Sequence, residues 1–312
     1  MKIAIVGAGW MGCHLAMKLK DKHEVQIYEA FGIFEETSYR NQNRLHLGYH
    51  YARNGKTRDM CRETFNRFIE DYPFLVDEID KNIYVVPKED SVVDFITYKK
   101  IFDEYEYSPT QLNCLSNIEG AISVQEKYIN PFKASQYFKE QLSEIIHYEN
   151  ISPIRLGELS EDNDLVINCT NNSLSAQQLN TYSEMCEVLV YEKTMDVEFG
   201  ALTFVDGELF SIFPYLNDLY TVTHVKYTPN SDMTTEDKQK KIEEAVSKYY
   251  PDFLDDFKFS GSFLSKKIKV VDKSDPRVPV IHLEGKILNC FTGKIQGIYV
   301  VQDFVEELCE SL

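Results

Sequence analysis

A strand, a glycine-rich turn and a helix follow one another at the start of the chain, and this order constrains the fold strongly. Residues 2–6 (KIAIV) predict a buried strand, and the apolar spacing of residues 13–20 predicts a helix. The turn between them is Gly7-Ala8-Gly9-Trp10-Met11-Gly12. In this context the first glycine forms the tight turn, the second admits a pyrophosphate, and the third packs the helix on the strand. The unit predicts a Rossmann-type α/β domain with a dinucleotide at the helix N-terminus.

A second predicted strand, residues 25–29, ends in the acid Glu29. A carboxylate at this distance from the turn accepts hydrogen bonds from both ribose hydroxyls of an adenosine. The same carboxylate repels a 2′-phosphate, which disfavours NADP. These residues are equally suited to NAD and to FAD, so the rest of the chain must separate the two cofactors.

Composition excludes several kinds of partner. The chain has 312 residues, about two domains by length, and a net charge of −17, which repels phosphate backbones, so we expect no nucleic-acid partner. No apolar run approaches the roughly 20 residues that span a bilayer, and we expect neither a signal peptide nor a membrane partner. The seven cysteines are scattered and odd in number, which favours reduced thiols over disulfides or a zinc site. We expect a cytoplasmic protein that acts on a small-molecule substrate and holds no metal.

Four later segments contain turns, and three of them carry glycine, histidine or proline there. Residues 40–53 (RNQNRLHLGYHYAR) are too polar for a core strand and too aromatic for a linker, which indicates an ordered loop. Residues 119–133 (EGAISVQEKYINPFK) place a proline at a helix start, and residues 164–173 (DLVINCTNNS) predict a buried strand that enters a polar turn. Residues 274–281 (SDPRVPVI) precede a strand, a second glycine turn at 293–297 (GKIQG) and a terminal helix. The N-terminus of that helix is a second site for partial negative charge.

Taken in order, these segments resemble the FAD-dependent amino acid oxidase superfamily, which includes D-amino acid oxidase, glycine oxidase, sarcosine oxidase and related hydroxy-acid dehydrogenases. Its members begin with GxGxxG and an acid that closes the second strand. The stretch LHLGYHY is similar to their flavin loop, and residues 119–133 and 164–171 are similar to their later strand and helix elements. SDPRVPVI and FTGKIQG resemble their Asp-x-x-Pro element and closing turn. Asn171 replaces a glycine of the superfamily, and asparagine tolerates a positive φ.

The resemblance implies that FAD is the cofactor. The N-terminal turn would hold the ADP half, and the C-terminal turn would close over the isoalloxazine ring, where Lys294 would add positive charge. The residues expected to contact FAD are Gly7, Gly9, Trp10, Met11, Gly12, Glu29, Ala30, Arg44, Leu45, His46, Thr170, Asn171, Gly293, Lys294, Ile295, Gln296 and Gly297.

The middle of the chain predicts a different kind of domain. Residues 185–228 are rich in strands joined by hairpins, with Asp206-Gly207 as one turn, and Thr234 is expected to cap a helix of residues 236–249. We therefore expect an α/β fold in which a Rossmann-type FAD-binding domain is interleaved with a mostly antiparallel α+β substrate domain. The expected ranges are 1–79, 119–184 and 274–312 for the FAD-binding domain, and 80–118 and 185–273 for the substrate domain.

Four residues are candidates for catalytic contacts with the substrate. Arg44 and Arg277 offer the bidentate fork that matches a carboxylate, although each also suits an ordinary ion pair. His46 matches the loop histidine of the superfamily, with an ordinary buried histidine as the alternative. His224 lies on a predicted strand of the substrate domain, where strand alternation allows it to face the flavin or the opposite side.

The implied activity is that of an FAD-dependent oxidoreductase, which removes a hydride from a carbon bearing an amine or hydroxyl and delivers it to flavin N5. The implied substrate is an amino acid, an amine or a hydroxy acid. Lys267 and Lys269 stand where the superfamily often carries an arginine, which departs from the pattern for an α-amino acid. Two alternatives stay open: an NAD-dependent dehydrogenase, which leaves the C-terminal turn without a role, and a flavin-binding regulatory or assembly protein whose catalytic site has decayed.

Overall fold

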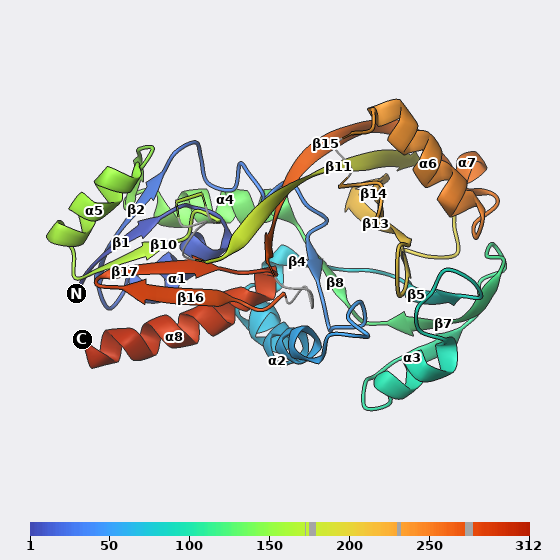
Figure 1. Ribbon diagram of the computed structural model, residues 1–312, viewed down its shortest axis with the longest axis horizontal. Coiled ribbons are helices and arrows are strands. Elements are labelled where there is room, and N and C mark those ends of the chain that lie inside the picture. The colour runs from blue at the N-terminus through green and yellow to red at the C-terminus, as the bar shows by residue number, and fades with distance from the viewer. Residues whose placement is uncertain (172, 175–178, 230–231, 272–276) are drawn as a thin grey trace.

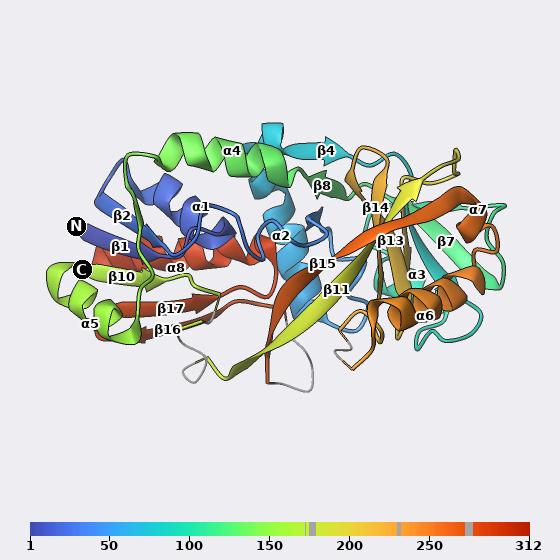
Figure 2. The ribbon, with the colours of Figure 1, turned by 90° about the horizontal axis from the view of Figure 1, so that it is seen from above.

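The computed structural model describes residues 1–171, 173–174, 179–229, 232–271 and 277–312. Two halves, each built on its own large sheet, lie side by side, and both chain termini lie in the same half (Figure 1). A small sheet and helix α2 lie between them (Figures 1 and 2). In the described part of the chain, no helix is both long and apolar enough to cross a membrane.

The first half is a six-stranded sheet in the order β16-β17-β10-β1-β2-β9, in which only the hairpin of β16 and β17 is antiparallel. Ile3 and Ile5 pack with α1, α4 and α8, whereas Ala4 and Val6 pack with α5 on the other face. Figure 2 shows α4 and α5 on opposite sides of this sheet. The alternation follows because successive side chains of a strand point to opposite faces. The elements are β1 (Lys2–Val6), α1 (Trp10–Leu19), β2 (Glu24–Glu29), α4 (Pro131–Leu142), β9 (Ile146–Tyr148), α5 (Pro153–Asp162), β10 (Leu165–Asn168), β16 (Val280–Glu284), β17 (Ile287–Phe291), η2 (Ile295–Gly297) and α8 (Ile298–Ser311).

The second half is an eight-stranded sheet in the order β15-β11-β14-β13-β12-β5-β7-β6, antiparallel except for the pair of β5 and β12. One core packs α6 and α7 on the sheet, and a separate core packs α3. The predicted turn at residues 206–207 joins β12 to β13, and Thr234 caps α6 by accepting a hydrogen bond from the Asp237 N–H. The elements are β5 (Asn82–Pro87), α3 (Phe95–Ile101), β6 (Ser108–Thr110), β7 (Ile118–Val124), β11 (Thr181–Lys193), β12 (Ala201–Phe204), β13 (Phe210–Leu216), β14 (Leu219–His224), α6 (Thr235–Ser247), α7 (Phe253–Asp256) and β15 (Phe257–Val270).

The region between the halves contains a three-stranded sheet in which β8 (Lys127–Ile129) pairs antiparallel with β3 (Arg44–Leu45) and β4 (Val76–Glu78). The predicted loop of residues 40–53 passes through β3 and leads into α2 (Gly55–Asp71), which the short helix η1 (Pro73–Leu75) follows. The loop is therefore attached at both ends to ordered elements, which holds its side chains in place between the two large sheets.

Sheet pairing confirms the predicted α/β class, with a Rossmann-type half and a mostly antiparallel half. The sheets divide the chain differently from the predicted ranges at two places. β7 pairs with β5 in the second sheet although the sequence pattern assigns residues from 119 onward to the FAD-binding domain, and β11 pairs with β15 from Thr181 rather than from residue 185. Strand pairing is non-local, so the composition of a segment does not reveal its partner. Residues 274–276 of the predicted Asp-x-x-Pro element lie outside the described residues.

Candidate active site

The N-terminal turn is packed so tightly that its three glycine positions leave no room for a Cβ. Gly7 has a φ of +101°, and a Cβ on Gly12 would lie 1.9 Å from the carbonyl oxygen of Gly7. A Cβ on Gly9 would lie 2.7 Å from Oγ of Ser38. Gly12 thus packs α1 onto the turn, and Gly7 and Gly9 leave the backbone at the N-terminus of α1 open to a ligand.

Glu29 lies beside this turn at the end of β2. Its two carboxylate oxygens accept hydrogen bonds from the N–H groups of Ala8, at 2.6 Å, and Phe31, at 3.0 Å. These bonds hold the carboxylate at the edge of the cavity, and each oxygen keeps a further lone pair for a ribose hydroxyl.

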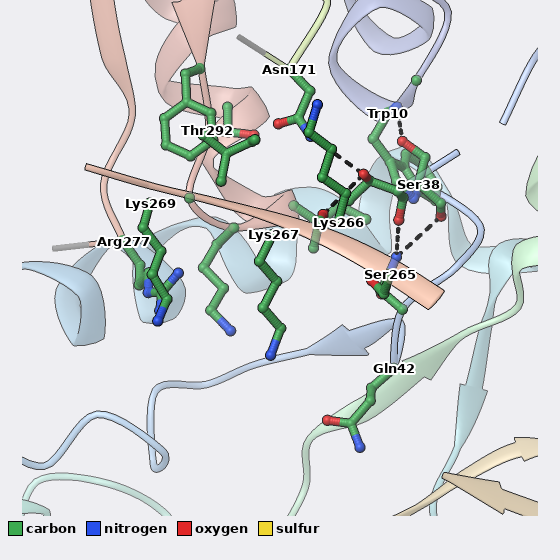
Figure 3. Close-up of a pocket in the computed structure, with 18 of the residues that line it drawn as sticks. Trp10, Ser38, Gln42, Asn171, Ser265, Lys266, Lys267, Lys269, Arg277 and Thr292 are labelled. Atoms are coloured by element: carbon green, nitrogen blue, oxygen red, sulfur yellow. Dashed lines mark hydrogen bonds between the residues drawn. The ribbon is translucent and has the colours of Figure 1, made fainter. Parts of the chain in front are cut away.

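Ser38 belongs to the phosphate end of the site, although the sequence pattern does not indicate it. Its Oγ accepts a hydrogen bond from the N–H of Trp10 at 2.9 Å, at the first turn of α1. Figure 3 shows Ser38 and Trp10 on one side of the cavity and Lys266 reaching toward Asn171. The backbone of Asn171 has a φ of +50°, as predicted for a residue that replaces glycine. In the sequence, a hydroxyl residue after a GxGxxG turn is only a weak indication of a phosphate contact. The fold shows that this hydroxyl lies beside the turn.

A single cavity of about 1540 Å³ extends from this turn to the second sheet. Both glycine turns contribute to its wall, although they lie at opposite ends of the sequence. Fifteen of the predicted site residues line it: Gly7, Gly9, Trp10, Met11, Glu29, Ala30, Arg44, His46, Thr170, Asn171, His224, Arg277, Gly293, Lys294 and Ile295.

Four residues predicted to contact the cofactor do not line this cavity, namely Gly12, Leu45, Gln296 and Gly297. Gly12 has the packing role described above, and Leu45 is fully buried in the hydrophobic core of the first half. Gln296 is also fully buried, and a Cβ on Gly297, which precedes α8, would lie 2.8 Å from Cγ of Pro279 and 3.2 Å from Cβ of Thr292. For these residues the prediction of direct contact needs correction, because a residue next to a ligand-facing residue in the sequence often points into the core.

Gln296 links the C-terminal turn to the histidine loop. Its side-chain amide accepts from the N–H of His46 at 3.1 Å and donates to the carbonyl oxygens of His46 and Cys61, at 2.7 and 2.8 Å. The Gln296 amide bonds the backbone of the loop as a neighbouring strand would, and it holds the second glycine turn against His46.

Glu126 binds the backbone of the same loop through its carboxylate, and the sequence analysis does not predict this residue. Its Oε1 accepts hydrogen bonds from the N–H groups of Leu47 and Gly48, at 2.7 and 3.2 Å, and its Oε2 accepts from the hydroxyl of Tyr84 at 2.6 Å. Burial opposes ionisation, but the His46 ring and these donors outweigh it, so the pKa of Glu126 lies below its ordinary value. No sequence motif marks this residue, since its partners come from two other segments, the loop at residues 46–48 and β5.

His46 is a neutral imidazole at the cavity wall. Burial and the Lys294 cation lower the pKa of His46 to about 4. Its Nδ1 lies 3.4 Å from Oε2 of Glu126, so the proton of the neutral ring belongs on Nδ1 and Nε2 keeps its lone pair. The ring also lies 6.0 Å from that of His50, whose pKa burial lowers well below its ordinary value.

Arg44 carries a positive charge into the buried part of the cavity wall. Its side chain is 9% exposed, its Nη1 donates to Oγ1 of Thr203 at 2.9 Å, and its guanidinium lies 4.1 Å from the centre of the Phe213 ring. Its Nε and Nη2 are shielded from solvent and form no hydrogen bond within the described part of the chain.

Lys294 lies on the second glycine turn, with its Nζ 4.9 Å from the centre of the Tyr51 ring. Burial and the charge of Arg277 lower the pKa of Lys294 to about 7. The amine therefore exists in both protonation states near neutral pH. Arg277 lines the same cavity, and its backbone packs on Gly293.

The second sheet contributes His224 and an apolar wall. Nδ1 of His224 accepts a hydrogen bond from the N–H of Lys226 at 3.2 Å, and burial lowers the pKa of His224 to about 4. The ring is therefore neutral with its proton on Nε2. The apolar wall consists of Phe204, Val205, Leu209 and Phe210.

The residues present fit FAD. The glycine cradle, the N-terminus of α1 and Glu29 suit a diphosphate and a ribose at one end, and the second glycine turn lines the same cavity beside Arg44 and His46. Arg44 and His46 lie on the wall of this cavity, where a bound ligand would meet the Arg44 cation and the neutral His46 ring.

Comparisons with known proteins agree with this arrangement. The family model of FAD dependent oxidoreductases matches residues 2–301. The chain is 30% identical over 346 residues to the FAD-dependent monooxygenase FPY4 of Fusarium mangiferae, covering 99% of this chain and 91% of that protein. It is 27% identical over 375 residues to the FAD-dependent monooxygenase kojA of Aspergillus flavus, covering 100% and 86%.

Solved structures show the same fold at low sequence identity. Glycine oxidase from Geobacillus kaustophilus has a TM-score of 0.76 over 99% of this chain and 94% of that chain, at 13% identity. The L-α-glycerophosphate oxidase of Mycoplasma pneumoniae, solved with FAD bound, has a TM-score of 0.72 over 97% and 92%, at 12% identity.

The family match includes both glycine turns, so the resemblance drawn from the sequence is confirmed and the alternative of an enzyme that uses NAD alone is wrong. The chain belongs to the FAD-dependent oxidoreductase family, and FAD is its cofactor.

Proposed function

We propose that the enzyme oxidises a small molecule at a carbon that bears an amine or a hydroxyl group, and that a carboxylate of this substrate binds Arg44. The supporting observation is that Arg44 is a buried cation of the cavity wall and forms no ion pair with an acidic side chain in the described part of the protein. Amino acids and hydroxy acids carry a carboxylate next to an oxidisable carbon. When bound, FAD supplies the redox chemistry by accepting the hydride of that carbon at its N5.

The chain's own residues would hold the cofactor at defined places. The N-terminus of α1, with Gly7, Gly9 and Ser38, would bind the pyrophosphate, and Glu29 would bind the adenosine ribose. The turn that begins at Gly293 would bind the flavin end through backbone N–H groups. Each of these contacts is part of the proposal, and each is based on residues that fit FAD.

The proton from the substrate's N–H or O–H bond needs an acceptor as the double bond of the imine or carbonyl product forms. We assign this role to Nζ of Lys294, since its pKa of about 7 leaves part of the amine unprotonated at neutral pH. Nε2 of His46 would accept a hydrogen bond and Nε2 of His224 would donate one, which orients the reacting group. The apolar wall of the second sheet excludes water.

The test is reduction of the purified yellow protein without oxygen. Amino acids, amines and hydroxy acids are added one at a time, and loss of the visible flavin absorbance is followed. We expect members of one class to bleach the flavin and to yield the matching imine-derived or carbonyl product. If none of them bleaches it, the function is contradicted and a binding protein with a decayed catalytic site is favoured.

A monooxygenase is a second candidate, because the fungal relative that is 30% identical carries that name. An isotopically labelled oxygen gas separates the two functions. Label in the organic product supports the monooxygenase, whereas label only in water or hydrogen peroxide supports the oxidation proposed above. We also propose a cytoplasmic location, supported by the seven free thiols.

A further inference from the structure

Strand β15 brings a lysine of the second sheet to the phosphate end of the cavity. The carbonyl oxygen of Lys266 accepts a hydrogen bond from Oγ1 of Thr37 at 3.1 Å, and the same Oγ1 accepts one from Nδ2 of Asn171 at 3.4 Å. The next residue along the chain, Ser38, binds the N–H of Trp10 at the start of α1. The backbone of residue 266 is therefore held close to the N-terminus of α1, although β15 belongs to the other half of the protein.

The side chain of Lys266 extends toward this end of the cavity, whereas the next lysines of β15 do not. Figure 3 shows Lys266 reaching toward Asn171, and it shows Lys267 and Lys269 extending from the opposite side of the strand, where Arg277 lies. The difference follows because successive side chains of a strand point to opposite faces. Lys266 also lines the cavity, so its ammonium group is accessible to a ligand there.

The charge of Lys266 is not used by the protein's own contacts. In the described part of the chain, Nζ of Lys266 forms no hydrogen bond and no ion pair. Nζ of Lys269 on the same strand, by contrast, pairs with Glu184 at 3.0 Å. The ammonium group of Lys266 is thus available to an anion from outside the protein.

The nucleotide end of the cavity needs positive charge. Carboxylates line this part of the wall, on β2 or in the segments that follow β2 and β9: Glu29, Glu35, Glu36 and Glu149. These carboxylates oppose the binding of a diphosphate. The N-terminus of α1 offsets part of the repulsion through its N–H groups, and an ammonium group offsets more because it donates charge-assisted hydrogen bonds to phosphate oxygens.

We infer that Nζ of Lys266 binds the pyrophosphate of FAD, so that the cofactor joins the second sheet to the nucleotide end of the first half. This inference rests on the part of the proposed function that places the pyrophosphate at the N-terminus of α1. It adds a ligand that neither glycine turn provides, and it assigns a cofactor contact to the sheet that faces the substrate.

The first measurement is the affinity of the full-length protein for FAD. The purified holoenzyme is diluted at constant salt, and the released cofactor is followed by its fluorescence. We expect Lys266→Gln to raise the dissociation constant of FAD about tenfold, because a charge-assisted hydrogen bond is lost. The Thr37 bond to the backbone carbonyl is retained in this variant, so the fold should persist. An unchanged dissociation constant would overturn the inference.

Two further variants separate a direct contact from a general effect of charge. Lys267→Gln removes the same charge from the next residue, on the opposite side of β15, and should leave the affinity for FAD nearly unchanged. Lys266→Arg keeps a cation at the site and should retain most of the affinity. Equal weakening by Lys266→Gln and Lys267→Gln would contradict a specific contact.

Salt separates a charge contact from a structural role of residue 266. The affinity of the wild-type protein for FAD should fall as salt rises, because salt screens a partly exposed ion pair. In Lys266→Gln the affinity should fall less steeply. Identical salt dependences in the two proteins would show that Lys266 does not pair with the pyrophosphate.

Ser38→Ala distinguishes failure of this inference from failure of the placement on which it rests, since the Ser38 hydroxyl is assigned to the same pyrophosphate. If Ser38→Ala weakens FAD binding and Lys266→Gln does not, only the contact of Lys266 is refuted. If neither variant weakens it, the placement of the pyrophosphate is refuted as well. Oxidation of the substrate is tested separately, by bleaching of the flavin at saturating FAD.

Discussion

Nδ1 of His46 lies 3.4 Å from Oε2 of Glu126, and both side chains are almost completely buried. His46 follows β3, whereas Glu126 lies between β7 and β8, so the contact joins the cavity loop to the segment that connects the two halves. The carboxylate also binds the backbone of the loop and the hydroxyl of Tyr84 on β5. One buried acid thus orients the ring of His46 and fixes the loop to the second sheet.

Replacing Glu126 by glutamine tests this support. The amide has a single acceptor oxygen, so it cannot accept from both the loop N–H groups and the Tyr84 hydroxyl. We expect Glu126→Gln to lower the free energy of unfolding by about 2–3 kcal/mol, as for lost bonds to a charged group, and to weaken FAD binding. Urea unfolding and FAD titration measure the two effects. Glu104→Gln, with a side chain that is 84% exposed, should change stability by no more than about 0.5 kcal/mol, and equal stability of both variants would refute the role of Glu126.

Removing the amide of Gln296 should loosen the second glycine turn. Gln296→Ala loses three buried hydrogen bonds and leaves their backbone partners unsatisfied. We expect a loss of about 2–4 kcal/mol in the free energy of unfolding, at roughly 1 kcal/mol for each bond plus desolvation. Gln136→Ala on the exposed face of α4 is the matched control. The midpoint of thermal unfolding is measured for both variants. Equal midpoints would contradict this role of Gln296.

The close contact at the N-terminal turn predicts a sharp difference between two glycines. Gly12→Ala would place a Cβ 1.9 Å from a backbone oxygen, which cannot move without displacing the turn. We expect a loss of about 3 kcal/mol or more in stability, together with loss of FAD. Gly157→Ala, in α5, meets nothing within 4 Å and should stabilise the protein by roughly 0.5–1 kcal/mol. A folded Gly12→Ala variant that retains FAD would show that the turn tolerates a side chain.

Lys294 predicts how stability depends on pH. Its pKa is about 7 in the folded FAD-free protein, against an ordinary 10.5, so between these values the unfolded chain binds more protons than the folded chain. Stability should therefore rise with pH across this window, by up to about 1.4 kcal/mol for each pH unit. Urea unfolding between pH 7 and about 10 measures the rise. Lys294→Met should abolish this rise in stability, and the control Lys240→Met, at an exposed lysine, should leave it unchanged. A rise that persists in Lys294→Met would come from another group.

Local features of the sequence were sufficient for the fold class and for the geometry of the N-terminal glycine turn. The GxGxxG turn and the acid at residue 29 are close in sequence, and the hydrogen bond from the Ala8 N–H to Glu29 is part of this short-range geometry. The positive φ of Asn171 and the cap at Thr234 are likewise local properties.

Tertiary structure alone decided which residues meet at the wall of the cavity. Strand pairing placed β7 in the second sheet, turned Leu45 and Gln296 into the core, and brought Glu126 behind His46. The cations that act on Lys294, namely Arg44, Lys267 and Arg277, likewise come from segments that are far apart in the chain. These arrangements depend on non-local packing and on the balance of buried charges, whereas a linear pattern records only the order of the residues.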